Sequence, residues 1–402
     1  MQIVYVEAVD GSDDLVVLSP QWLCCDVIGQ LLSHDRVTRC RPIGRFSLDE
    51  IHMMFPDCSV TKLVPLLQTM ELCSPVVEDS ETAEFEIMSL NFVEEFDNFV
   101  NDDDDEDDDN ESQQPGWVYG GTRLVASHRI GPQLTSVFPR VQTRLRRQLD
   151  VVAGCDDCEL DQWYGGSRLV TSGGAVQLIV SASVDCDIVD IKCRTAPSCR
   201  PTAFQLSASV CRLVTDVLGD CLPSLAVEQQ TLSVGDLSTP MSTVLSAYAP
   251  RDLRRMLEHG SVSDDVSSAA ENVVDLVAFG STEIFSSLTR STSLPLSVGL
   301  SLSTRRAVAK FLDQSHPTGR DWCMLAAQLG LNADELEGID RGRVECSPTD
   351  QCLAAWIRRD GDSATVSALA AKLSALGRHD AEDCLLSALP VFVYKSLMSA
   401  SP

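Results

Sequence analysis

The residues of this chain whose type and spacing could do chemistry begin with the segment Cys155-Asp156-Asp157-Cys158. A C-x-x-C pair can form half of a zinc site or a redox-active dithiol. Zinc would need two further ligands, and Cys186, Cys193 and Cys199 contain no second pair of matching spacing. Negative charge beside a thiol disfavours the thiolate, which argues against redox chemistry. We therefore expect no metal and no cofactor.

Six histidines are the other candidates for chemistry, and they are scattered along the chain: His34, His52, His128, His259, His316 and His379. No Gly-x-Ser-x-Gly segment, which carries the nucleophile of many hydrolases, accompanies them. Each histidine is therefore interpreted as a surface residue or a hydrogen-bonded core residue. The sequence predicts no catalytic residue.

The charge of the chain limits its partners. Its 402 residues carry a net charge of −28, and Asp102 to Asp109 form an unbroken acidic run. Such a charge argues against general binding to nucleic acid or to an anionic membrane. We interpret the run as a solvated loop, with binding of a cation or a basic partner as the alternative.

The N-terminus and the cysteine content bear on the compartment. Met1 is followed by no basic and apolar leader, and no uncharged run is long and apolar enough to span a bilayer. Sixteen cysteines are therefore expected to be mostly reduced and buried. We expect a cytoplasmic protein.

The most regular pattern lies in residues 300–392, where capping signals separate six short amphipathic helices. Asn332 and Glu335 form a capping-box pattern, and Ser347-Pro348 places an N-cap residue before a proline. Asp380 is predicted to cap the sixth helix. The predicted core consists of Trp322, Leu325, Leu329, Trp356, Leu369, Leu373 and Leu385.

Charged residues on these helices are the candidate partner-binding residues. The basic candidates are Arg341 and Arg343, between the third and fourth helices, and Arg358 and Arg359, at the end of the fourth. The acidic candidates lie on the third helix: Asp334, Glu335 and Glu337. Both signs on one domain permit self-association or pairing with another protein. The alternative is that they are ordinary solvating charges.

Several segments of this region resemble a death domain, a six-helix bundle that pairs with its own kind. They are Asp321-Trp322-Cys323-Met324-Leu325-Ala326, Leu329-Gly330-Leu331, Ser347-Pro348 followed by Trp356, and Leu376-Gly377-Arg378-His379-Asp380-Ala381. Together with His316-Pro317, the sequence of these segments is most similar to the death domain of death-associated protein kinases. The resemblance implies apoptotic or stress signalling, death-domain partners and docking of a MAP kinase.

The upstream sequence predicts two mixed regions. Residues 1–100 show a helix, helix and strand order that suggests a winged-helix-like module, and 117–260 suggest a layered α+β domain with Val118 to Ser127 as a hairpin and a helix opening at Pro139. Residues 101–116 are predicted as an acidic disordered linker, 261–299 as a mostly flexible Ser/Thr-rich linker and 393–402 as a tail. The predicted fold class is thus multidomain, with an α+β region followed by an all-α bundle.

Three upstream segments resemble the COR region of Roco proteins and death-associated protein kinases. They are Val17-Leu18-Ser19-Pro20-Gln21-Trp22-Leu23-Cys24, Phe138-Pro139-Arg140-Val141-Gln142 and Trp163-Tyr164-Gly165-Gly166-Ser167-Arg168-Leu169. COR followed by a death domain is the order that this kinase family implies. The resemblance also implies dimerisation through this region, although the oligomeric state stays open.

The kinase and GTPase motifs that such a family implies are missing from these 402 residues. There is no Gly-rich loop with a His-Arg-Asp and an Asp-Phe-Gly segment, and no Gly-x4-Gly-Lys-Ser/Thr loop. The leading hypothesis is therefore a non-catalytic interaction and regulatory module. The alternatives are the C-terminal part of a serine/threonine protein kinase, either a truncated gene model or a natural kinase-free product, and a COR-mediated dimerisation scaffold.

Overall fold

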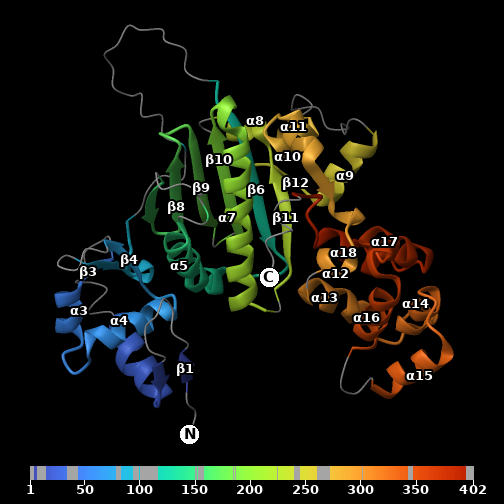
Figure 1. Ribbon diagram of the computed structural model, residues 1–402, viewed down its shortest axis with the longest axis horizontal. Helices are drawn as coiled ribbons and strands as arrows, with labels where there is room; N and C mark the ends of the chain where they lie inside the picture. The colour runs from blue at the N-terminus through green and yellow to red at the C-terminus, as the bar shows by residue number, and fades with distance from the viewer. Residues whose placement is uncertain are drawn as a thin grey trace. The chain divides into compact units, whose positions relative to one another are not determined.

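The computed structural model describes residues 4–6, 15–33, 44–77, 83–93, 99, 116–149, 152, 158–183, 185, 187–223, 225–239, 245–259, 272–300, 302–342 and 347–394 (Figure 1). The chain divides into two compact units. The first comprises Met1–Trp117 and Ile130–Cys221, and the second comprises Val118–Arg129 and Leu222–Pro402. This division differs from the boundaries predicted near residues 100 and 260. Residues 118–129 and 222–260, which were predicted to belong to the middle region, lie in the second unit.

The first unit begins with a small α/β part. Its elements are β1 (Val4–Val6), β2 (Leu15–Val17), the π-helix η1 (Trp22–Ile28), α1 (Gly29–Leu31), β3 (Arg45–Ser47), α3 (Leu48–Met54), α4 (Val60–Thr69), β4 (Ser74–Val77), β5 (Glu84–Glu86) and η2 (Met88–Leu90). The last three strands form an antiparallel sheet in the order β3-β5-β4. Ser47 and Glu50 form a capping box that starts α3 directly after β3.

The second part of the first unit is a sheet covered by helices. It consists of β7 (Glu159–Trp163), β8 (Gly166–Thr171), β9 (Val176–Ser183), β10 (Ile188–Thr195), η3 (Pro197–Cys199) and the helices α5 (Gly131–Arg147) and α7 (Arg200–Cys221). Neighbouring strands from β7 to β10 pair antiparallel. Every residue of β10 from Val189 to Thr195 is buried, and α7 packs on β9 and β10 (Figure 1).

The predicted start of α5 at Pro139 is wrong. The helix begins eight residues earlier, at Gly131, with Pro132 in its first turn and Pro139 inside it. Proline in a helix interior removes one backbone hydrogen bond without ending the helix if packing compensates. Here Val137, Phe138 and Val141 are all buried around that position. Tertiary packing therefore overrides the local start signal.

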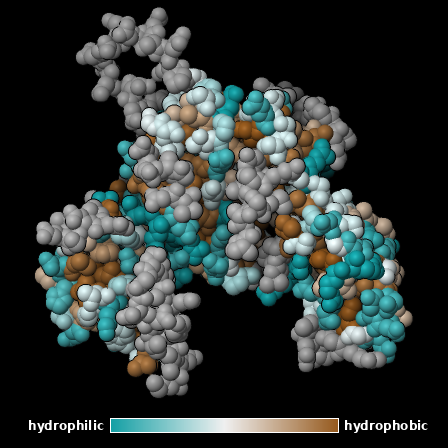
Figure 2. All heavy atoms as spheres, viewed as in Figure 1, coloured by the Kyte–Doolittle hydropathy of each residue, from teal (hydrophilic) through white to brown (hydrophobic). Residues whose placement is uncertain are grey.

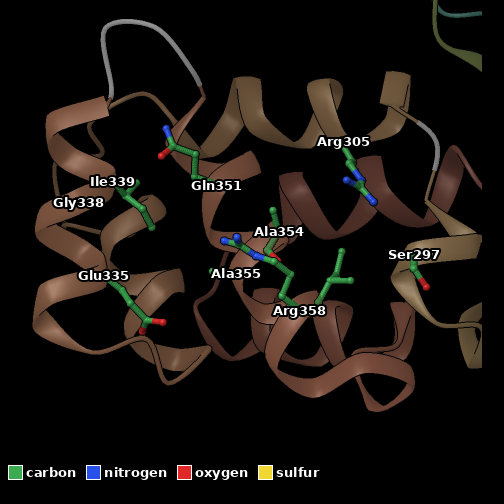
Figure 3. Close-up of a pocket in the computed structure, with 10 residues that line it drawn as sticks. Ser297, Arg305, Glu335, Gly338, Ile339, Gln351, Ala354, Ala355 and Arg358 are labelled. Atoms are coloured by element: carbon green, nitrogen blue, oxygen red, sulfur yellow. The ribbon is translucent and has the colours of Figure 1, made fainter.

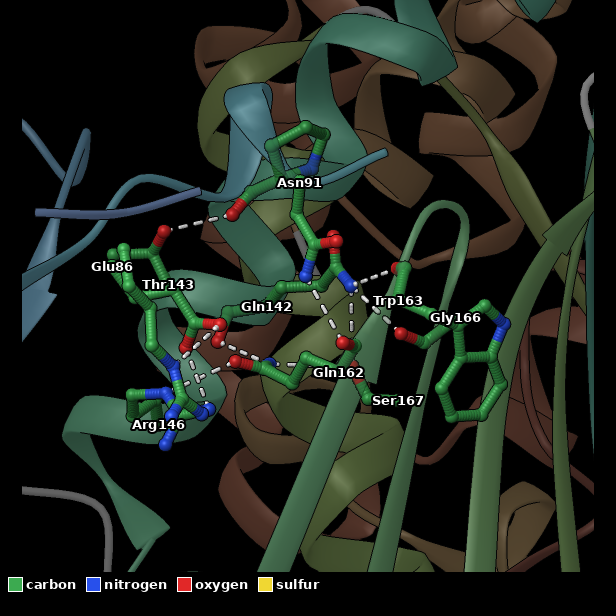
Figure 4. A network of polar contacts seen from close by, with 11 residues as sticks. Glu86, Asn91, Gln142, Thr143, Arg146, Gln162, Trp163, Gly166 and Ser167 are labelled. Atoms are coloured by element: carbon green, nitrogen blue, oxygen red, sulfur yellow. Dashed lines mark hydrogen bonds and ion pairs between the residues drawn. The ribbon is translucent and has the colours of Figure 1, made fainter. Parts of the chain in front are cut away.

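A network of buried polar side chains joins the two parts of the first unit (Figure 4). The Gln142 amide on α5 donates to the carbonyls of Trp163 and Gly166, at 2.9 and 2.7 Å. The Gln162 amide donates to the Gln142 carbonyl at 3.0 Å, and the Asn91 amide donates to the Gln162 carbonyl, also at 3.0 Å.

An ion pair completes this network. The Glu86 carboxylate of β5 lies 2.7 Å from an Arg146 guanidinium nitrogen of α5, and Glu86 is only 1% exposed. The Arg146 Nε also donates to Gln162 at 3.1 Å. The small α/β part is thereby held to the covered sheet by hydrogen bonds as well as by apolar contacts.

The two ends of the acidic segment meet at one side chain. The Arg194 guanidinium on β10 lies 5.2 Å from the ring centroid of Phe99 and 4.8 Å from that of Trp117, and its Nε donates to Gln177 at 2.9 Å. Guanidinium groups bind aromatic faces at such distances. The acidic run predicted at 101–116 lies between these two aromatic residues and outside the described residues, except for Gly116.

The second unit starts with three antiparallel strands and short helices. They are β6 (Val118–Ala126), α8 (Val234–Leu237), β11 (Val227–Leu232), β12 (Ala247–Tyr248), α9 (Pro250–His259), α10 (Val273–Ala278), α11 (Thr282–Ser287), β13 (Leu288–Arg290), η4 (Ser291–Ser293) and α12 (Leu296–Gly299). The strand β11 pairs antiparallel with β6 and with β12.

The hairpin predicted at Val118 to Ser127 is instead the single strand β6. Gly120 lies within this strand, and a Cβ at this position would lie 2.7 Å from the ring of Phe279. The glycine is needed because an aromatic ring from a distant segment packs onto the strand.

The six predicted helices follow: α13 (Leu302–Leu312), α14 (Trp322–Gln328), α15 (Ala333–Gly342), α16 (Pro348–Asp360), α17 (Val366–Ala375) and α18 (His379–Ser387). The short η5 (Gly361–Ser363) joins α16 to α17, and β14 (Phe392–Tyr394) follows α18. One local prediction is wrong, because Asp380 does not cap α18 but lies inside its first turn.

The linker predicted at 261–299 is ordered where the structure describes it, from residue 272 onward. Leu296 and Leu300 belong to the core of the six-helix bundle. The Leu296 amide donates to the Ala364 carbonyl at 2.8 Å. The strand β13, which precedes the six helices, pairs with β14, which follows them. The Ser/Thr-rich composition suggested a flexible linker, because its few apolar residues pack on partners that are distant in the sequence. Within the described ranges, no helix has the length and apolarity needed to cross a membrane.

Candidate protein-interaction site

The six-helix bundle is held by an apolar core. All seven predicted core residues are buried in one cluster: Trp322, Leu325, Leu329, Trp356, Leu369, Leu373 and Leu385. Side-chain caps start four of its helices, at Asp321, Asn332, Ser347 and Thr365. On the face shown in Figure 2, hydrophilic side chains cover much of this bundle, with hydrophobic ones between them. The surface charges are therefore available for contacts, while the core holds the helices in place.

The predicted partner-binding residue Arg359 has a structural role. Its guanidinium donates to the carbonyls of Leu329 and Gly330 at the end of α14, at 2.6 and 2.8 Å, and pairs with Asp360 at 2.6 Å. The Lys372 ammonium donates to the Gln328 carbonyl beside them, at 2.8 Å. Cations stabilise the last carbonyls of a helix, which lack intrahelical donors. Arg359 thus closes α14.

The acidic candidates on α15 differ from one another. The Glu335 carboxylate accepts the Asn332 amide at 2.8 Å, and the Asn332 side chain accepts the Glu335 amide at 2.9 Å, so this pair forms the predicted capping box. Asp334 and Glu337 are exposed. Arg341 lies on α15, but its side chain is outside the described residues, and so is the whole of Arg343.

A groove of about 630 Å³ runs between α12, α13, α15 and α16 (Figure 3). It brings together two predicted residues, Glu335 and Arg358, with residues that the prediction missed: Ser297, Arg305, Gly338, Ile339, Gln351, Ala354, Ala355 and Ile357. Arg305 and Arg358 come from different helices and lie toward the same space in Figure 3. The signal that could have found the groove is Gly338, a glycine inside a helical run.

The electrostatics of this groove are positive at one wall. The Arg358 Nε donates to the Ala354 carbonyl of its own helix at 3.3 Å, and the buried Arg305 Nε has no hydrogen-bond partner in the described part of the chain. Burial raises the pKa of Asp350, and the charges of Arg305 and Arg306 act in the opposite direction. Arg305 and Asp350 interact through charge without forming an ion pair.

Arg358 and Arg359 are neighbours in the sequence, and the structure separates their expected effects. Arg359→Glu is expected to lower the midpoint of thermal unfolding, because a carboxylate at this position repels the last carbonyls of α14. Arg358→Glu should lower the midpoint less, since its side chain is exposed and donates only to a carbonyl of its own helix. Differential scanning fluorimetry of both variants checks this, and equal midpoints would contradict it.

The start of α18 carries a pH-sensitive pair. The Arg378 guanidinium donates to both Asp380 oxygens, at 2.9 and 2.8 Å, and to the carbonyls of Phe311 and Arg320. These hydrogen bonds lower the pKa of Asp380 to about 2 from 3.8. A lowered folded-state pKa gives stability that is complete above the unfolded value and is lost as the pH falls through the folded one.

The free energy of unfolding should therefore fall between about pH 4 and about pH 2, and this fall should be shallower in Asp380→Asn. The contribution is modest because the Asp380 side chain is 47% exposed to solvent. Urea titrations at a series of pH values measure the slope. Identical slopes for the variant and the wild type would exclude Asp380 as its source.

The cysteine pair weighed for chemistry is only partly described. Cys155 and Cys186 lie outside the described residues. Burial raises the pKa of Cys193 to about 12, which keeps that thiol protonated and unreactive. Within the described ranges, no group of three or more His, Cys, Asp or Glu side chains is arranged to hold a metal ion.

Comparison with known families identifies the bundle. Residues 305–389 match the Death domain family, and the described helices α13 to α18 account for that match. The C-terminal bundle is therefore an all-helical death domain, a protein-interaction module of the kind that works in apoptosis signalling.

A relative then places the rest of the chain. The death-associated protein kinase dapk-1 of Caenorhabditis elegans is 27% identical over 405 residues, which cover 98% of this chain and 27% of that protein. The chain is thus a relative of death-associated protein kinases that carries a death domain. It spans about a quarter of the length of the curated relative.

Proposed function

We propose that this chain is a non-catalytic interaction and regulatory module of the death-associated kinase type. It associates through its death domain with other death-domain proteins in apoptotic or stress signalling in the cytoplasm. The single observation that carries this proposal is the death domain itself, matched over residues 305–389 and built on one continuous core with surface charges of both signs. Rim charges of this kind govern partner choice more than affinity.

Co-precipitation tests the association. The tagged full chain should retain a panel of purified death-domain proteins, or a second differently tagged copy of itself. The control is Trp356→Ala, in which the bundle loses a buried core residue and should lose every such contact. If wild type and control retain the same proteins, the association does not go through the folded death domain.

The non-catalytic part of the proposal has its own test. The 402 residues contain no kinase or P-loop motif, and the relative's name as a kinase refers to a protein of which this chain covers 27%. Purified chain should therefore incorporate no phosphate from ATP into a general acceptor protein and should not retain GTP on a filter. Activity that co-purifies through size exclusion would overturn this.

A second candidate role is self-association through the upstream region, as the COR resemblance implies. The order helix, strand, helix, helix, strand, strand between residues 22 and 86, with β5 between β3 and β4, supports the winged-helix-like part of that resemblance. Light scattering of the full chain carrying Trp356→Ala separates this role from the death domain. A dimeric mass supports it, and a monomeric mass at all concentrations counts against it.

A further inference from the structure

The groove of the death domain contains a glycine that the fold does not need. Gly338 lies inside α15 without a positive φ angle, and a Cβ added there would meet nothing within 4 Å. Glycine inside a helix destabilises that helix relative to alanine. No packing contact in the described structure explains that cost. The open space above Gly338 is part of the groove itself.

The floor beside Gly338 is small and apolar. Ala354 and Ala355 of α16 and Ile339 of α15 line it, so the floor offers methyl groups and no hydrogen-bonding side chain. Small side chains at facing positions leave room for a larger one from another molecule, as in helix-in-groove recognition. The floor therefore suits an aliphatic or aromatic side chain.

The charges at the rim of the groove determine which charge a bound segment should carry. Arg305 and Arg358 supply two guanidinium groups, and neither forms an ion pair with a described residue. The opposite wall holds one carboxylate, Glu335, which already accepts the Asn332 amide. The lining residues of the groove thus carry two positive charges and one negative charge, and a carboxylate is the natural complement of this net positive charge.

We propose that this groove, defined by Arg305, Gly338, Ile339, Ala354, Ala355 and Arg358, binds an acidic amphipathic segment of a partner protein. An apolar side chain of that segment lies over Gly338 and the alanines, and a neighbouring carboxylate lies between Arg305 and Arg358. This inference rests on the proposed function as an interaction module, and it specifies where one partner binds and by what chemistry.

The test uses the full chain and two labelled synthetic peptides. One is an amphipathic helix with leucines on one face and glutamates beside them, and the other carries glutamine in place of every glutamate. Fluorescence anisotropy measures their binding to the wild type and to Gly338→Leu and Arg358→Glu. The matched control is Arg251→Glu, an arginine on α9 whose side chain is 80% exposed and does not line the groove.

The glutamate peptide should bind the wild type and Arg251→Glu equally, and bind Gly338→Leu and Arg358→Glu at least about tenfold more weakly. The glutamine peptide should bind the wild type more weakly than the glutamate peptide. Gly338→Ala, which adds a helix-favouring methyl group in open space, should raise the thermal midpoint and shows that position 338 tolerates a side chain.

Three outcomes would overturn the proposal. They are equal binding of the two peptides, binding that Gly338→Leu and Arg358→Glu leave unchanged, and absence of peptide binding together with self-association that Gly338→Leu abolishes. The last outcome makes a second copy of the chain the occupant. Retention of death-domain proteins by both groove variants would then show that the proposed function stands while this groove does not serve it.

Discussion

Trp356→Ala is expected to lower the free energy of unfolding of the death domain by about 3–5 kcal/mol. Trp356 is 3% exposed, in the same core cluster as Leu353 and Leu369. Its Nε1 donates to the Asp360 carboxylate at 2.7 Å, and the Lys372 ammonium lies 5.8 Å from its ring centroid. The substitution therefore empties a core position and loosens the two cations that close α14.

Trp356→Phe separates these contributions. Phenylalanine keeps much of the apolar volume but cannot donate to Asp360, so its cost should be nearer about 1 kcal/mol. Urea unfolding followed by near-ultraviolet circular dichroism measures both variants. Native domains are stable by only about 5–15 kcal/mol, so the alanine variant could lose binding simply by unfolding. Equal costs for the two substitutions would show that the hydrogen bond, not the core volume, dominates.

Glu86→Gln is expected to destabilise the first unit by about 3–5 kcal/mol, because it leaves the charge of Arg146 buried without a partner. The Arg146 side chain is 13% exposed, and Arg45, at 3.8 Å from Glu86, is closer to the surface. Burial raises the pKa of Glu86 although both arginines lower it. The attraction of the two arginines therefore does not fully offset the loss of hydration, and we expect the pair to be costly to break without adding net stability.

The double variant Glu86→Leu with Arg146→Met tests this interpretation. Removing both charges leaves only Arg45, whose side chain is 38% exposed, without its ion-pair partner, so the double variant should be closer in stability to the wild type than Glu86→Gln is. Chemical denaturation of the full chain, followed by the tryptophans of the first unit, measures the three proteins. A double variant that is less stable than the single one would show that the ion pair itself stabilises the fold.

The helices of the death domain were predictable because the signals that define them are local. Asn332 with Glu335, and Ser347 before Pro348, cap helices at the positions where the sequence placed caps. The buried stripe from Trp322 to Leu329 likewise follows the helical period. Each of these features depends on residues within one or two turns of each other.

The features that the sequence did not reveal depend on distant partners. Gly120 has the residue type of a turn, and its role in β6 depends on Phe279, which is distant in the sequence. Leu296 lies in a Ser/Thr-rich segment, and its place in the bundle core depends on residues of the six helices. The candidate binding residues show the same limit. Arg358 and Arg359 are equivalent in sequence, and only the three-dimensional position of the end of α14 gives Arg359 a structural role.

The contact of Arg194 with both Phe99 and Trp117 has a practical consequence for engineering the protein. The two aromatic residues lie on either side of the acidic stretch in the sequence, and both contact the Arg194 guanidinium. The chain before the acidic stretch and the chain after it are therefore each fixed to β10. Closing a longer loop between fixed ends costs only about 0.6 kcal/mol for each doubling of its length. An affinity tag or a fluorescent reporter inserted between these residues should therefore preserve both contacts with Arg194 and the fold of the death domain.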